Sequence, residues 1–169
     1  MFGRWSKSAR AVDSPPGAGE LELAVRRELP RADDETALVV TAMAGLLGAV
    51  AFADRRYSPD EEARIRRELE RVHGMTAEGI DAICAVLRQH IVEVSTVQAP
   101  RYSRVLVELA DRELRLEVLG LMLEIAAADG AIGHSEVNVL RQVTTALGLS
   151  QADYNELQKK HRDRLSVLK

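Results

Sequence analysis

The sequence predicts an all-α fold. Ala, Leu, Val, Glu and Arg dominate the 169 residues, and only six residues are aromatic, which favours helices over strands. Apolar residues recur every three or four positions, and no stretch shows sustained alternation with a period of two. We therefore expect a bundle of about seven to eight helices, with a single domain over residues 20–169 that follows a flexible basic, Pro- and Gly-containing arm over residues 1–19.

Charge and cysteine content limit the classes of function. The formal net charge of −3 gives no basis for nucleic-acid binding by the chain as a whole. The single cysteine, Cys84, cannot form an internal disulfide, and the first ten residues lack the apolar run of a secretory signal, so we expect a cytoplasmic location. Those ten residues combine Phe2 and Trp5 with four cationic groups, so peripheral contact of the arm with the inner face of a membrane is an alternative to a disordered arm.

The first half of the chain predicts four helices. Residues 20–29 form a short one that Pro30 ends, and residues 34–53 form the next. Residues 36–53 carry no charge and reach the lower length limit of a membrane span, but Ala, Gly and Thr and the charged flanks favour a buried central helix. Ser58 and Glu61 then form a capping box for a helix that ends near Gly74, and Thr76 caps a helix to about residue 94.

The second half begins after an expected loop at residues 95–100. A short helix is predicted over residues 103–109, and a long one over residues 112–128 has two apolar faces, which indicates a central position. A helix over residues 135–147 ends at Gly148, and Ser150 caps the last helix, which Tyr154, Leu157, His161 and Leu165 line.

An internal repeat appears when the sequence is shifted by 75 positions. Asp54 falls on Asp129 and Glu61 falls on Glu136, within halves of about residues 34–94 and 103–165. Each half reads as helix, Asp-led loop, helix and capped helix, so a pseudo-symmetric bundle is predicted. We expect small residues to let the two central helices approach closely: Gly45, Gly48, Ala49 and Gly120.

Two stretches of the second half resemble a known family. The segment AAADGAIGHSE (residues 126–136), followed by ALGLSQADY (residues 146–154), is similar to the TerB-like tellurite-resistance domain, which also forms the N-terminal part of some membrane-anchored DnaJ-type co-chaperones. The resemblance implies a two-fold-related helical bundle, acidic loop residues suspected of binding metal, and protein partners in bacterial stress-response or phage-defence assemblies near the inner membrane. It implies no established enzymatic reaction.

Carried over by position, the candidate metal residues are Asp129 and Glu136 in the second copy and Asp54 and Glu61 in the first. Oxygen ligands of this kind suit Ca²⁺ or Mg²⁺, but the same acids can instead end one helix and start the next. Arg55 and Arg56 follow Asp54 and oppose cation binding there.

Three functions follow from these patterns. The leading hypothesis is a non-enzymatic interaction or metal-sensing domain in stress response or envelope homeostasis. The alternative is a purely structural partner-binding module without a ligand, in which the acids only cap helices. A carboxylate-based hydrolase is a third, weaker interpretation, because the sequence shows no nucleophile or phosphate cradle beside the acids.

Overall fold

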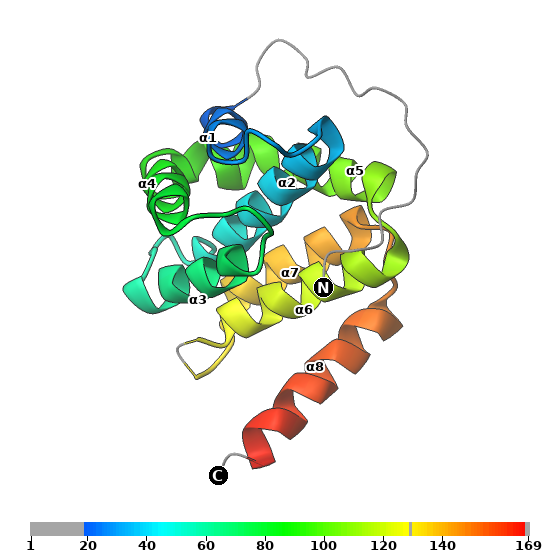
Figure 1. The fold of residues 1–169 in the computed structure, drawn as a ribbon. Helices are drawn as coiled ribbons and strands as arrows, with labels where there is room; N and C mark the ends of the chain where they lie inside the picture. The colour runs from blue at the N-terminus through cyan, green and yellow to red at the C-terminus, as the bar shows by residue number, and fades with distance from the viewer. Residues whose placement is uncertain (1–18, 129, 168–169) are drawn as a thin grey trace.

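The computed structural model describes residues 19–128 and 130–167, and every regular element in that part of the chain is helical (Figure 1). The predicted all-α fold is therefore confirmed. The expected arm lies outside the described residues except for Gly19, as do Asp129 and the side chain of Leu165. The elements in chain order are α1 (Glu20–Glu28), α2 (Asp34–Ala51), α3 (Pro59–Glu70), α4 (Ala77–Glu93), the π-helical segment η1 (Val94–Gln98), α5 (Ala99–Leu109), α6 (Arg112–Ala126), α7 (His134–Ala146) and α8 (Gln151–Val167).

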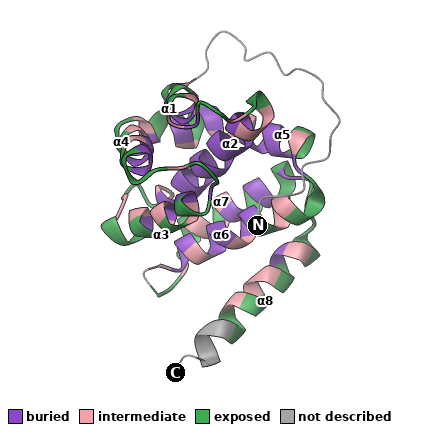
Figure 2. Cartoon of the chain, in the orientation of Figure 1, coloured by how far each residue is buried: buried purple, intermediate pink, exposed green. Residues whose placement is uncertain are grey.

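Helix α2 is the centre of the bundle. Every residue from 37 to 51 is buried, because α1, α4 and α5 pack on one side of the helix and α3, α6 and α7 on the other (Figures 1 and 2). In the described part of the chain α2 alone has the length and composition of a membrane span, but 83% of its apolar window is buried inside the protein. The interpretation of this segment as a buried central helix is confirmed.

The predicted helix starts are formed by the predicted side chains. Ser58, Thr76 and Ser150 each accept a hydrogen bond from a backbone N–H in the first turn of the helix that follows, at 3.0–3.2 Å. Asp33 and Asp111 do the same for the two central helices, α2 and α6, at 2.8 Å. These caps satisfy N–H groups that have no partner within the helix.

The expected loop at residues 95–100 is wrong. The chain bends at His90, where φ is −113° and ψ is 19°, and then continues through η1 directly into α5. Pro100 lies in the first turn of α5, where no backbone N–H is needed. Thr96 Oγ1 donates to the Val92 carbonyl at 2.6 Å, and Gln98 is buried, so packing and side-chain hydrogen bonds support a helical path through this polar stretch.

The glycines of the central helices have different neighbours from those predicted. A Cβ on Gly45 would lie 2.2 Å from the ring of Tyr102 in α5, and a Cβ on Gly48 would meet Leu87 of α4 at 3.1 Å. The nearest side chain to Gly120 is Leu157 of α8. The space over these three glycines is therefore filled by side chains of α4, α5 and α8, while α2 and α6 also contact each other.

Candidate functional site

The candidate acids lie at two helix junctions. We call residues 52–61, from the end of α2 through the first turn of α3, the first junction, and residues 127–136, from the end of α6 through the first turn of α7, the second junction. Their backbone hydrogen bonds recur with an offset of 75 residues. In the first junction the backbone N–H donors and carbonyl acceptors are Phe52 to Gly48 (3.0 Å), Ala53 to Val50 (3.1 Å) and Arg55 to Phe52 (2.9 Å). In the second junction they are Ala127 to Leu123, Ala128 to Ile125 and Gly130 to Ala127, each at 3.0 Å.

Both junctions turn at a residue with positive φ. Gly130 has φ of 101°, and the residue at the same offset in the first junction, Arg55, has φ of 64°. An L-residue with a side chain adopts this left-handed conformation at a cost of roughly 1–2 kcal/mol, which glycine avoids. The first junction therefore keeps the same turn with a less suitable residue.

The acids of the first junction are engaged by backbone donors. The Asp54 carboxylate is exposed and accepts the Arg56 N–H at 2.8 Å. Glu61 is only 5% exposed, and its Oε2 accepts the Ser58 N–H at 2.9 Å while its own N–H donates to Ser58 Oγ at 3.2 Å. The predicted capping box is thus confirmed, and Glu61 serves to start α3.

The second junction starts its helix differently. Gly133 is the N-cap residue of α7 and offers no side chain for a cap. Glu136, in the first turn, is half-buried and folds back over Gly133, because a Cβ on that glycine would lie 2.5 Å from Glu136 Oε2. No hydrogen bond to the Glu136 carboxylate is found among the described residues. His134, the first residue of α7, is exposed.

The carboxylates of the first junction already have partners other than an ion. Its two carboxylates are held by backbone N–H groups, and Arg55 and Arg56 stand beside the exposed one. Within residues 19–128 and 130–167, no three or more His, Cys, Asp or Glu side chains come together as an ion site. Glu136 is the candidate acid whose carboxylate is still available there, and its partner in the sequence-based hypothesis, Asp129, lies outside the described residues.

Beside the first junction lies a cluster that joins α3 to α4. Arg88 donates to both carboxylate oxygens of Glu62, at 2.8 and 3.1 Å. Cys84 is fully buried beneath this pair, and burial raises the pKa of its thiol to about 11. A thiol of that pKa is protonated and shielded at neutral pH, which fits a structural residue rather than a nucleophile.

Tyr57 packs against the same cluster. Burial raises the pKa of its phenol well above the usual range, and the neighbouring Cys84 and Glu62 add to the shift. Its hydroxyl is buried without a hydrogen-bond partner in the described part of the chain. The residue at the same offset in the second junction is Ile132, which also packs partly buried against the core.

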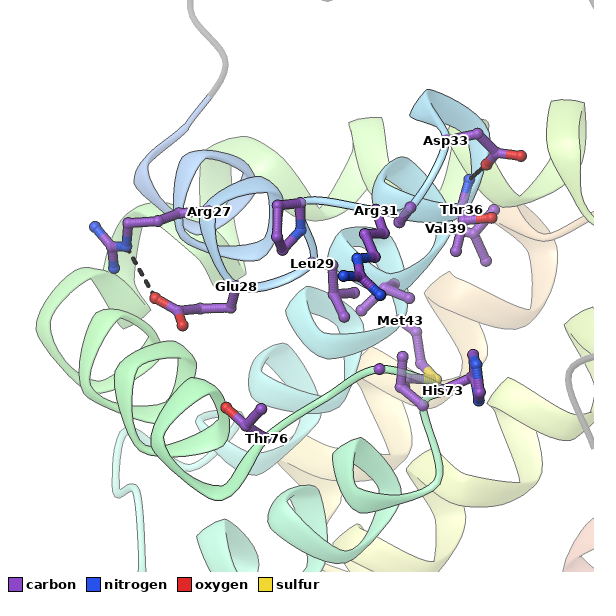
Figure 3. A pocket seen from close by; sticks show the side chains of 15 residues that line it. Arg27, Glu28, Leu29, Arg31, Asp33, Thr36, Val39, Met43, His73 and Thr76 are labelled. Carbon is purple, nitrogen blue, oxygen red and sulfur yellow. Dashed lines mark hydrogen bonds and ion pairs between the residues drawn. The ribbon is translucent and has the colours of Figure 1, made fainter.

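A groove lies at the C-terminal end of α1, and the sequence did not predict it. It has a volume of about 780 Å³ and is bounded by residues 27–33, by one face of α2 and by residues 72–76 between α3 and α4 (Figure 3). The one local signal was that Arg31 falls in the short loop between the helix stop at Pro30 and the cap at Asp33.

The described chain is thus a small all-α bundle. Two of its helix junctions have matching backbone hydrogen bonds, and acidic residues stand at the starts of the helices that follow. The family model of the tellurite resistance protein TerB matches residues 40–159, which include both junctions. The chain belongs to the TerB family. No curated protein and no solved structure gives a significant match.

Proposed function

We propose that this TerB-family chain is a non-enzymatic interaction domain that acts in bacterial stress response or envelope homeostasis. Its partners are proteins of a stress complex in the cytoplasm, at the inner face of the membrane, and nucleic acid is not among them. The family description, tellurite resistance, supports the stress-response assignment. The observation that carries a sensing role is that the two junctions share a backbone but use their glutamates differently.

We further propose that the two halves are copies of one unit, related by pseudo-symmetry. The recurring junction hydrogen bonds support this relation. The capped starts of α4 and α8, at Thr76 and Ser150, support it as well. In the first copy the Glu61 carboxylate accepts the Ser58 N–H in the capping box. In the second copy Glu136 retains a carboxylate that, with Asp129, offers oxygen ligands for Ca²⁺ or Mg²⁺.

The ion part of the proposal is tested by thermal unfolding with and without Ca²⁺ or Mg²⁺. A ligand at about one hundred times its Kd stabilises the native state by about 2.7 kcal/mol. We expect the wild type and the control Asp54→Asn to show equal increases in Tm, and Asp129→Asn and Glu136→Gln to lose the response. If all four proteins show the same increase, the ion binds elsewhere and these acids only cap helices. If none responds, the alternative of a structural partner-binding module without a ligand replaces metal sensing.

The interaction part is tested in cells that express the chain. A photo-crosslinking residue at the exposed position His134 reports contacts of the second junction, and one at the exposed position Arg104 of α5 is the matched control. We expect a discrete protein adduct from position 134 that changes when divalent ions are chelated. An adduct that is unaffected by chelator favours the purely structural module. Turnover in a broad hydrolase screen that disappears in Glu136→Gln would contradict the non-enzymatic assignment.

A further inference from the structure

The outward face of the stretch from the end of α4 through η1 and α5 is apolar. Among the residues that the structure describes, the exposed large apolar side chains are Leu23, Val92, Val97 and Val107, and the three valines share this one stretch. They are 60%, 68% and 42% exposed, so their methyl groups are open to contact. The solvent face of a surface helix is normally polar, which makes this grouping a candidate interaction surface.

The three valines belong to one stripe. Val97 and Val107 recur with Pro100 and Arg104, which are also exposed, at the three- and four-residue spacing of a single helix face. Val92 precedes Val97 by five residues, which is one turn of a π-helix such as η1. We call these five residues the outer stripe. Its part from Val97 to Val107 is about 15 Å long, since an α-helix rises 1.5 Å per residue.

The chemistry of the outer stripe suits an aromatic side chain with cationic neighbours. Arg104 lies between Pro100 and Val107 in the stripe, and its guanidinium has no hydrogen bond or ion pair within residues 19–128 and 130–167. A guanidinium is attracted to the face of an aromatic ring, most strongly to that of tryptophan, and the same ring can cover valine methyl groups. Glu93 and Glu108, both exposed, flank the stripe and attract cations.

The chain itself contains a segment of this chemistry. Residues 1–18, which lie outside the described residues, include the single tryptophan of the chain, Trp5. Arg4 and Lys7 stand on either side of it, and Arg10 follows. With three cationic side chains and one acidic side chain, the segment is opposite in charge to the glutamates that flank the outer stripe.

The segment joins the described chain beside the stripe. Gly19 is the first described residue, and a Cβ on it would lie 3.5 Å from Nε2 of Gln98 in η1. An extended chain from Gly19 to Trp5 spans up to about 45 Å, whereas Gln98 and Val107 are only about 14 Å apart along the helix. Trp5 can therefore reach every residue of the outer stripe.

We propose that residues 1–18 bind the outer stripe of their own chain, with the Trp5 ring over Arg104 and the neighbouring valines. The cations of the segment then face Glu93 and Glu108. The covalent tether gives the segment an effective concentration on the order of 1 mM, so a weak contact suffices. The outer stripe contains no residue of either junction, so failure of this proposal would leave the proposed function untouched.

The fluorescence of Trp5 tests the contact in the full chain, because no other tryptophan contributes. The emission should be shifted to the blue of that of a synthetic peptide of residues 1–18. A mostly bound segment should also be quenched by acrylamide at least about twofold less steeply than the peptide. Emission and quenching equal to those of the peptide overturn the proposal. Shielding that increases with protein concentration also overturns it, in favour of binding to a second copy.

Variants at exposed positions locate the surface. Val97→Ser combined with Val107→Ser should lower the ratio of bound to free segment about tenfold and bring the quenching close to that of the peptide. Leu23→Ser is the matched control, since it removes an exposed apolar side chain from α1, outside the stripe, and should behave as wild type. Far-ultraviolet circular dichroism shows whether each variant is folded. Equal quenching of the folded stripe variant and the control contradicts the proposal.

A photo-crosslinking residue at position 97 gives an independent readout. Peptide mapping should find a crosslink to residues 1–18 within the same chain, and the same reagent at position 23 should give little of it. Vesicles that contain anionic lipid distinguish a membrane surface as the preferred partner of the segment. The crosslink should persist in their presence. Its loss on addition of vesicles, or its absence without them, overturns the proposal.

Discussion

The two junctions share three backbone hydrogen bonds at matching positions, but their side chains are used differently. The first carries a full capping box on Ser58 and Glu61, and it tolerates Arg55 in a left-handed conformation. The second places Gly130, which adopts positive φ without strain, at the turn and Gly133 at the cap, so the start of α7 has no side-chain cap. Side-chain hydrogen bonds therefore stabilise the first junction, whereas glycines suited to the turn stabilise the second. The Glu136 carboxylate is then available to bind an ion.

The largest expected difference between the junctions is the cost of removing each glutamate. Glu61→Ala leaves the part-buried Ser58 N–H without an acceptor and should lower the free energy of unfolding by about 2 kcal/mol. Glu136→Ala should cost about 0.5 kcal/mol or less, because only the interaction with the helix dipole is lost. Urea denaturation of both variants at neutral pH measures this difference. Equal losses would show that the second helix start depends on its glutamate as much as the first.

A swap of the turn residues gives the next largest effect. Gly130→Arg forces a side chain into the left-handed region and should cost roughly 1–2 kcal/mol. Arg55→Gly removes the same strain but adds flexibility to the unfolded chain, so a net gain of about 0.5 kcal/mol is expected. The measurement is again chemical denaturation, with Arg56→Gly as the control without positive φ. A loss of stability in Arg55→Gly would indicate that the Arg55 side chain itself contributes to the fold.

The smaller glycine effect concerns the cap. Gly133 has φ of −77°, which any residue adopts, and Glu136 already lies over it. Gly133→Ser should therefore complete a capping box like that of Ser58 and Glu61 and stabilise the protein by about 0.5 kcal/mol. Gly133→Ala, which adds a Cβ without an acceptor, should give no gain. If an ion binds Glu136, the serine variant should also respond less to that ion, since the carboxylate then has a competing partner.

Features with a local cause could be predicted from the sequence. The caps at Ser58, Thr76 and Ser150 follow from side chains that reach only three residues along the chain. The burial of α2 follows from its uncharged composition. The path through η1 could not be predicted in the same way, because burial of Gln98 and contact with α2 outweigh the local preference of a polar, Pro-containing stretch for a loop.

Features that join distant segments were inaccessible to sequence reasoning. The groove combines three segments of the chain, and no spacing within one segment indicates that residues 27–33 and 72–76 line it together with α2. The neighbours of the glycines could not be predicted for the same reason, since only the packing shows that Tyr102 fills the space over Gly45. The capping box of Ser58 and Glu61 was predicted from the sequence, but the burial of the Glu61 side chain was known only from the packing.

Tyr57 and Ile132 provide the last difference between the junctions, and it is the smallest at neutral pH. The Tyr57 hydroxyl is buried without a partner in the described structure, so Tyr57→Phe should be as stable as wild type or slightly more stable at pH 7.

Burial raises the pKa of the Tyr57 phenol in the folded state, so folding favours the neutral form. That contribution is complete below the unfolded pKa of about 10 and is lost as pH rises above it. Wild type should thus lose stability more steeply than Tyr57→Phe above about pH 10, by urea denaturation at several pH values. Tyr102 and Cys84 also have raised pKa values, so the variant should keep a shallower slope, while identical slopes would mean that the phenol reaches solvent before it ionises.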